Sequence, residues 1–457
     1  MPMNRSFLLP DRLFLRQAAH IALPMTIQYI IVSLLNIMDV VLVQGLGDQA
    51  IAAVSLANQV NFIVSLMVFG ITSGATTFMA QYFGQGSDEG VRKSMALSLA
   101  LVLGLTFLYS AFVMAAPEVA MHIFTNDSQL VALGKQYLPI VAPTYLLSGV
   151  TLTYSSVMRC TGRAKLPMFA SIIALSLNTV MNYLLIYGIG GFPKLGIVGA
   201  AVATLLSRTI EIIIILLFDY VPRNRFKVTW RDFRHIDKPF TIQFFQKTTP
   251  VILNESIWGI GTAGYSMIFG RMGTAAVAAM NIASTMEQLF SVLFRGASNA
   301  ALVMLGNELG AGKINRAKLD AGRFCFWGTM MGILIGVVMS LLSRGFVSLL
   351  FGGVTAETAA LSVHIIYIIS AYMPLRAFMS IVIVGVLRSG GDTMYAFMLD
   401  TLPIYLISLP AGILLGIVFG QPMELVLSVM YTYSIIQSIF GIRRMLSYKW
   451  AKKIVHS

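Results

Sequence analysis

A single acidic residue, Asp39, lies deep inside a long apolar stretch near the start of the chain. Thr26, Tyr29, Ser33 and Asn36 precede it at intervals of three or four residues, so in a helix all five share one face. A charge at the centre of a bilayer costs about 2.5–3.5 kcal/mol on insertion scales, which makes an acid kept there a candidate for function. No arginine lies one turn away as an obvious partner. We therefore favour cation binding over a purely structural role for Asp39.

Two asparagines, Asn178 and Asn182, are four residues apart and share one face of a predicted helix. Amide oxygens are hard ligands that suit sodium when a carboxylate and a hydroxyl join them. Thr204, in the segment GAAVAT, supplies a hydroxyl. An Asn pair by itself can also simply bridge two helices. Together with Asp39, these residues predict a site for Na⁺ or H⁺.

The second half of the chain contains further polar residues inside apolar stretches, and they are our candidates for an acidic or substrate-binding site: Asn254, Glu255, Glu287 and Asp400. A carboxylate in apolar surroundings can take up and release a proton, or attract a cationic substrate. The structural alternative is an ion pair inside the membrane, for example Glu287 with Arg295 or Asp400 with Arg376. In the first half, Arg208 and Glu211 are three residues apart and most simply pair with each other.

The elements that must position these residues are transmembrane helices. Of the 457 residues, 57% are hydrophobic and 11% are charged, whereas about a quarter are charged in a soluble domain. One bilayer crossing takes about 20 apolar residues. We predict an all-α membrane protein with twelve spans: 20–44, 50–80, 94–116, 131–158, 166–190, 196–220, 240–270, 276–306, 319–343, 359–387, 394–418 and 423–445.

The net charge of +13 is explained by topology. Basic residues cluster in the N-terminal segment, in the linker 223–238 and at the C-terminus, and such clusters mark the cytoplasmic side. Both termini are therefore expected in the cytoplasm, in a bacterial inner membrane, and no nucleic-acid partner is expected. We expect no removable signal peptide in the N-terminal segment, because it has no short apolar core followed by a small-residue cleavage site.

The chain contains an internal duplication. PMTIQYIIVSLLNIMDVVLVQGLGDQAIAAV begins at Pro24 and matches PVILNESIWGIGTAGYSMIFGRMGTAAVAAM, which begins at Pro250, an offset of 226 (250 − 24). VMRCTG around Arg159 likewise matches VLRSGG around Arg388. We expect an N-terminal lobe at 1–222, a basic linker at 223–238 and a C-terminal lobe at 239–457, with a pseudo-twofold axis and a central cavity.

Several segments together resemble the multidrug and toxic compound extrusion (MATE) transporters: MDVVLVQGLGDQAIAAVSLA, the GQG turn, VMRCTGRAKLP, LSLNTVMNYLLIYG, FPKLGIVGAAVATLLSR, PVILNES and VLRSGGDT. The resemblance covers essentially the whole chain. It implies two lobes with alternating access, and export of organic, often cationic, compounds coupled to sodium or proton entry. It also implies that Asp39 is the N-lobe coupling carboxylate, joined by Asn178, the position of Asn182, and Thr204. Glu255 matches the family's acidic position on the seventh helix.

The sequence departs from the family pattern at two places. Members of the family often carry Asp where Asn182 stands, so one charge is missing here. Some members have an acid on the tenth helix, about where this chain has Arg376 and Ala377.

Two other functions are alternatives to export. A related flippase for a polyprenyl-linked saccharide or other lipid shares this helix plan, and basic residues in the spans keep it open: Arg208, Lys247, Arg295 and Arg376. An intramembrane enzyme is not expected, because no catalytic motif is present. No Walker A sequence supports ATP-driven transport either. Two cysteines and five scattered histidines give no metal-binding spacing. We expect no prosthetic cofactor, small organic substrates and membrane lipid as partners, and a monomer.

Overall fold

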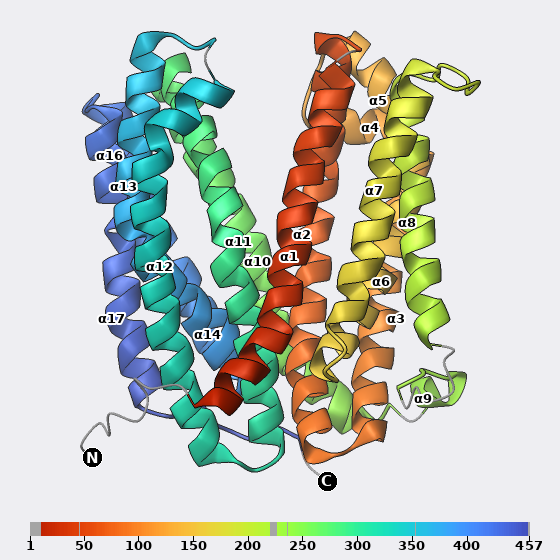
Figure 1. Ribbon diagram of the computed structural model, residues 1–457, viewed down its shortest axis with the longest axis vertical. Coiled ribbons are helices and arrows are strands. Elements are labelled where there is room, and N and C mark those ends of the chain that lie inside the picture. Colours follow the sequence, from red (N-terminus) through yellow and green to blue (C-terminus); the bar gives the residue numbers. More distant parts are fainter. Residues whose placement is uncertain (1–10, 45, 220–225, 235, 352, 456–457) are drawn as a thin grey trace. The chain divides into compact units, whose positions relative to one another are not determined.

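The structure is a computed structural model that describes residues 11–44, 46–219, 226–234, 236–351 and 353–455, without the side chains of 35–41, 43, 44, 48, 218 and 219. Every regular element in these ranges is a helix (Figure 1). The first repeat contains α1 (Arg12–Gln44), α2 (Asp48–Gln85), α3 (Asp88–Ala115), α4 (Pro117–His122), α5 (Ser128–Val141), α6 (Pro143–Cys160), α7 (Lys165–Tyr187) and α8 (Ile197–Asp219).

A short helix, α9 (Trp230–Arg234), precedes the second repeat. That repeat contains α10 (Lys238–Met272), α11 (Thr274–Gly310), α12 (Ile314–Leu350), α13 (Ala356–Ser380), α14 (Thr393–Pro403), α15 (Leu409–Gly412), α16 (Met423–Tyr431) and α17 (Tyr433–Leu446). Three π-helical stretches interrupt it: η2 (Ile381–Leu387), η3 (Ile404–Ser408) and η4 (Ile413–Val418). π-Helical turns are uncommon and are frequent at functional sites.

Ten helical segments of the described chain are long and apolar enough to cross a membrane, and each corresponds to one of the twelve predicted spans. The other two predicted spans are also helical. The span 131–158 is divided into α5 and α6 at Ala142, just before Pro143, as expected for a proline there. The span 240–270 lies within α10, whose 35 residues include several polar side chains. Pro374, by contrast, lies inside continuous α13.

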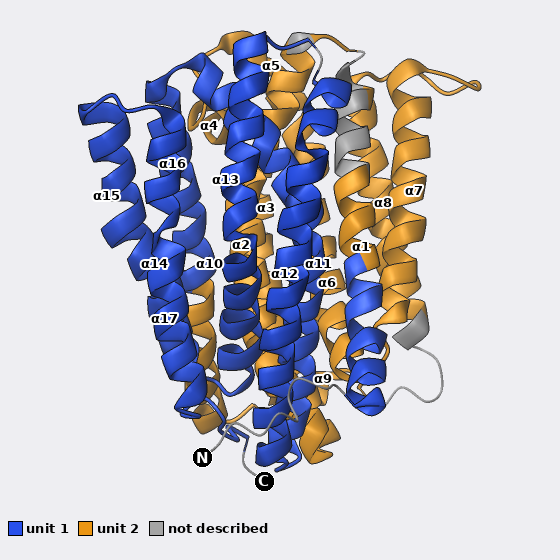
Figure 2. Cartoon of the chain, turned by 60° about the vertical axis from the view of Figure 1, so that its left-hand side comes forward, with its two compact units in different colours: residues 1–26, 253–457 blue, residues 27–252 orange. Residues whose placement is uncertain are grey.

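The chain forms two compact units, Met1–Thr26 with Leu253–Ser457 and Ile27–Ile252 (Figure 2). Both boundaries fall inside a long helix, α1 or α10, two residues after a proline. Pro24 and Pro250 are equivalent positions of the two repeats. Each proline lacks the N–H that would continue the helical hydrogen bonds. Each helix is therefore weakened close to the point where the chain passes from one compact unit to the other. The start of each repeat thus belongs to the unit made mostly by the other repeat.

Small residues bring neighbouring helices close together within each unit. A Cβ added to Gly199 of α8 would lie 2.6 Å from the carbonyl oxygen of Leu185 in α7. In the other unit, a Cβ on Gly336 of α12 would overlap the carbonyl oxygen of Ser370 in α13. Without a hydrophobic force between helices in lipid, such close approach is a main source of packing energy. These contacts fix the helices that carry the buried polar residues.

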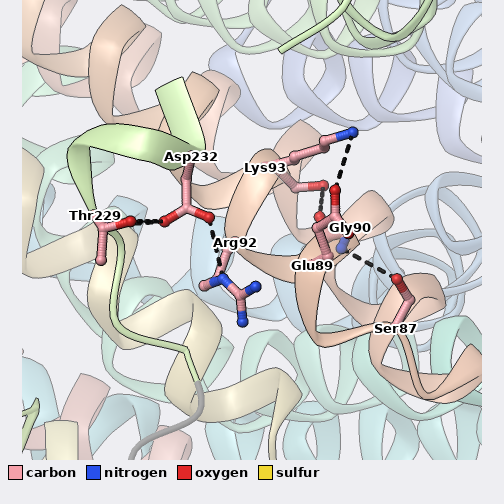
Figure 3. Close-up of polar contacts among 8 residues, drawn as sticks. Ser87, Glu89, Gly90, Arg92, Lys93, Thr229 and Asp232 are labelled. Carbon is pink, nitrogen blue, oxygen red and sulfur yellow. Dashed lines mark hydrogen bonds and ion pairs between the residues drawn. The ribbon is translucent and has the colours of Figure 1, made fainter. Parts of the chain in front are cut away.

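The linker before the second repeat is attached to the first repeat by a carboxylate. Asp232 of α9 accepts hydrogen bonds from the backbone N–H and the hydroxyl of Thr229, each at 2.7 Å, and its Oδ1 lies 3.1 Å from Arg92 Nε of α3 (Figure 3). Burial alone would raise the pKa of Asp232, but the Thr229 hydrogen bonds and the Arg92 guanidinium outweigh it and hold this pKa below its ordinary value. Residues 223–225 and 235 of the predicted linker lie outside the described residues.

Candidate cation-binding sites

The three neutral residues predicted for the first site come together between α7 and α8. Asn182 Nδ2 donates to Asn178 Oδ1 at 3.2 Å, and Asn178 Nδ2 donates to Thr204 Oγ1 at 3.5 Å. Thr204 gives its own proton to the carbonyl of Ala200 at 3.0 Å, so its oxygen can still accept. Both asparagines are buried. The fourth predicted member, Asp39, belongs to α1, but its side chain lies outside the described residues.

A second polar network lies along the same two helices. Arg208 Nη1 is 2.7 Å from Glu211 Oε2, which confirms the ion pair predicted from their spacing. The other oxygen of Glu211 accepts from Ser171 Oγ of α7 at 2.7 Å, and Ser171 accepts from Gln28 Nε2 of α1 at 2.8 Å. Glu211 is therefore neutralised and hydrogen-bonded at both oxygens. The network joins α1, α7 and α8 and accounts for a carboxylate that is otherwise costly to bury.

In the second repeat, Glu255 of α10 is paired with a buried arginine. Arg388 Nη2, at the end of η2, lies 2.8 Å from Glu255 Oε1, and Arg388 is 1% exposed. Spacing along the sequence did not predict this pair, because Glu255 and Arg388 are 133 residues apart. The apolar run before Arg388 and the glycines after it hid the signal, because both are also typical of a helix end.

Glu287 is also in an ion pair, but with a different residue from the one proposed as its structural alternative. Glu287 Oε1 of α11 is 2.5 Å from Arg376 Nη2 of α13. The same guanidinium lies 5.7 Å from the ring centroid of Tyr431, a cation–π distance. Arg295 is exposed. Arg376, the basic residue at the tenth-helix position, therefore neutralises Glu287 and does not pair with Asp400.

Asp400 of α14 is held by two amides. Asn254 Nδ2 of α10 donates to Asp400 Oδ2 at 3.1 Å, and Gln437 Nε2 of α17 donates to Asp400 Oδ1 at 3.0 Å. Sequence reasoning missed Gln437, whose signal was a lone amide in the apolar segment YSIIQSIF. Of the predicted group in the second repeat, the structure thus joins Asn254 to Asp400, and separates Glu255 and Glu287 into their own ion pairs.

The segment VLRSGGDT connects these helices to the C-terminal segment. A Cβ on Gly390 would overlap the carbonyl oxygen of Trp450, so only glycine allows this approach. Asp392 accepts two hydrogen bonds from Arg444 of α17, at 2.6 Å from Nε and 2.9 Å from Nη2. Such a bidentate pair fixes orientation as well as distance. The segment therefore has an architectural role beside the Arg388–Glu255 pair.

Among the residues that the structure describes, no three His, Cys, Asp or Glu side chains come close enough together to hold a metal ion. Cys160 and Cys325 are buried and do not form a disulfide.

Two repeats of long apolar helices with buried polar networks are typical of a membrane transporter, and comparison with known proteins identifies the family. A protein-family model described as MatE matches residues 24–184 and 250–418, so the chain belongs to the MATE family. It is 21% identical to the uncharacterized transporter YisQ of Bacillus subtilis, over 84% of this chain and 83% of the relative. It is 22% identical to a probable multidrug resistance protein NorM of Thermotoga maritima, over 96% and 94%. A solved outward-facing MATE transporter of the MOP superfamily superposes with a TM-score of 0.86, at 19% identity, over 95% of this chain and 96% of the other. The fold is therefore the twelve-helix, two-lobe MATE fold.

Proposed function

We propose that the protein is an antiporter that exports small organic compounds, cationic or amphipathic in character, in exchange for Na⁺ or H⁺. The observation that carries the proposal is the buried Asn178–Asn182–Thr204 network between α7 and α8. Its oxygens are neutral and hard, the type that a small monovalent cation prefers. The names of relatives as multidrug resistance proteins support the substrate class.

The proposed cycle assigns the coupling ion to the first repeat. Asp39 supplies the charge, and Asn178, Asn182 and Thr204 supply neutral oxygens or hold Asp39 in place. Binding of the ion on one side of the membrane and of the organic substrate on the other would drive alternating access of the two lobes. The protein would act as a monomer in the bacterial inner membrane, with both termini in the cytoplasm.

Efflux from proteoliposomes tests this proposal. Sodium and pH gradients are imposed separately, and release of a panel of cationic dyes is followed. We expect gradient-driven efflux in the unchanged protein and none in Asp39→Asn, which keeps the side-chain shape but loses the charge. Asp127→Asn is the matched control, because Asp127 caps α5 at an exposed site. Unchanged coupled efflux by Asp39→Asn would remove Asp39 from the mechanism.

The lipid-flippase alternative depends on basic residues that could hold a pyrophosphate. Two of the four candidates, Arg208 and Arg376, are each neutralised by a glutamate, and this favours export of organic cations. The same vesicles decide the question when they carry a fluorescent polyprenyl-pyrophosphate saccharide. Gradient-independent movement of that lipid, without dye efflux, would establish the flippase instead.

A further inference from the structure

The second repeat contains three predicted acids, and only one of them is without an ion-pair partner. Glu255 is paired with Arg388 and Glu287 with Arg376. Among the described residues, no basic side chain lies within 4.0 Å of Asp400, whose contacts are the neutral amides of Asn254 and Gln437. Asp400 lies inside the candidate span Thr393–Val418. An ionised carboxylate there is costly unless a proton or another cation neutralises it.

The backbone around Asp400 is built to hold the side chain of Gln437 in one orientation. Pro403 has no N–H, so the carbonyl of Leu399 loses its usual helical donor. Gln437 Nε2 donates to that carbonyl at 3.2 Å as well as to Asp400. Both N–H groups of this amide are used, and neither acceptor would tolerate the amide oxygen in its place. The π-helix η3 begins directly after Pro403.

The amide of Asn254 is different, because only one side of it is used. Its Nδ2 donates to Asp400, whereas its Oδ1 is buried and has no hydrogen-bond partner among the described residues. Asn254 is 3% exposed. A buried acceptor without a donor is costly and calls for an explanation. Rotation of this amide by half a turn would present Oδ1 to Asp400.

That rotation is what protonation of Asp400 requires. The ionised carboxylate accepts from both amides. When one of its oxygens takes up a proton, it becomes a donor and needs an acceptor. Asn254 Oδ1 can accept this proton after rotation, while Gln437 keeps its bond to the other oxygen. The carboxyl group of Asp400 can therefore form its hydrogen bonds in both protonation states, and only the side chain of Asn254 has to rotate.

The groups that act on Asp400 electrostatically come from the elements around it. They are Glu255 of α10, Arg388 of η2 and the phenol of Tyr433 at the start of α17. Glu255 and Arg388 largely cancel, because they are paired with each other. Two further hydroxyls fix α10 against η3: Tyr265 donates to Ser408 at 2.8 Å, and Tyr405 donates to the carbonyl of Ile257 at 2.7 Å. Asn254 therefore stays opposite Asp400.

We propose that Asp400, with Asn254 as its switchable partner and Gln437 as its fixed partner, is a proton-binding site of the second repeat, separate from Asp39. The site binds one proton and releases it to water, and no other bond changes. Its use in transport rests on the proposed antiport function.

Infrared difference spectroscopy on the full-length protein in lipid nanodiscs tests the site without a transport assay. On acidification we expect the C=O band of a protonated carboxyl that shifts slowly in D₂O. The band should be lost in Asp400→Asn and kept in Glu287→Gln. In Asn254→Leu, which keeps the acid but removes the acceptor, the band should move to higher frequency. Replacing choline by Na⁺ at acid pH should leave it unchanged.

Persistence of the full band in Asp400→Asn would overturn the proposal, as would its removal by Na⁺. An unshifted band in Asn254→Leu would overturn the assigned role of Asn254. The two proposals fail separately. The band without gradient-driven efflux would refute the antiport function and leave the site. Proton-driven efflux without the band would refute the proton-binding site at Asp400 and leave the antiport function.

Discussion

The guanidinium of Arg388 lies 2.8 Å from the carboxylate of Glu255, although the two residues are 133 positions apart in the chain. Glu255 occupies the position at which the family resemblance places an acidic group, yet here its charge is already balanced by a side chain of the same unit. The pair is one of two that neutralise a candidate acid of the second repeat, the other being Glu287 with Arg376. Its energetic consequence can be measured directly.

Replacing Glu255 by Gln should destabilise the protein by about 3–5 kcal/mol, because it leaves Arg388 buried with its charge uncompensated. Thermal unfolding of the purified protein in detergent measures the loss. The double variant Glu255→Gln, Arg388→Met removes both charges and should recover most of the stability, since an apolar pair can replace a buried ion pair. A single variant as stable as the unchanged protein would show that Arg388 does not depend on Glu255.

Replacing Asn182 by Asp should strengthen sodium binding. A second carboxylate would stand beside Asn178 and restore the charge that the family often carries, and affinity for hard cations rises with the number of charged ligands. We expect about a tenfold tighter dissociation constant, equivalent to about 1.4 kcal/mol, by isothermal titration with NaCl against choline chloride. Asn182→Leu is the control and should weaken binding. Equal affinity in both variants would argue against a cation at this position.

Replacing Gly390 by Ala should displace the C-terminal segment, because the added methyl group would overlap the carbonyl oxygen of Trp450. Trp450 is fully buried, so its displacement should increase quenching of tryptophan fluorescence by acrylamide and protease cleavage near the C-terminus. Gly345→Ala is the matched control, because a Cβ there meets nothing within 4 Å. Identical behaviour of the two variants would show that the segment is not held at Gly390.

Replacing Asp232 by Asn should loosen α9. Hydrogen bonds to a charged group contribute about 1.5–3 kcal/mol each, so the amide of Thr229 should exchange with D₂O about ten times faster or more at pH 7. Glu89→Gln, which removes the exposed acid beside Lys93, is the control and should leave this amide unchanged.

The direction of the pKa shift of Asp232 determines how the same contact depends on pH. The pKa of Asp232 is lowered on folding, so its contribution to stability is present at neutral pH, above the pKa of the unfolded chain. It is lost only as the pH falls through the still lower pKa of the folded state. Protection of Thr229 should therefore persist down to about pH 4, the ordinary range of an aspartate. Loss of protection near pH 6 would contradict this assignment.

Much of the fold could be predicted from the sequence, because length and hydropathy dictate the helices and an offset of 226 residues defines the repeat. The pairing of Arg208 with Glu211 was also predictable, since three residues on one helix fix their distance. Pairings between helices were not. The sequence offered two arginines as partners for Glu287, and the choice between them depends on how the helices pack. In the structure the partner is Arg376 and not Arg295.

Other features depend on backbone geometry that the residue pattern does not encode. A proline inside a helix usually kinks or breaks it, but α13 continues through Pro374, since neighbouring helices in a membrane can satisfy the freed backbone groups. Gln437 gained its importance from the carbonyl that Pro403 leaves open on another helix. The spacing of Pro403 and Gln437 in the sequence does not indicate this hydrogen bond. The position of the Asp39 carboxylate stays a prediction.

The exchange of segments between the two compact units has a consequence for biosynthesis. Residues 1–26 leave the ribosome before residues 27–252, but the residues with which they form one unit, 253–457, are made after them. The intervening 226 residues (252 − 26) can complete their own unit in the meantime. A gene divided between the repeats, after residue 222, would separate each unit from a segment that it needs. A circularly permuted gene that begins at residue 27 would instead encode both units without interruption.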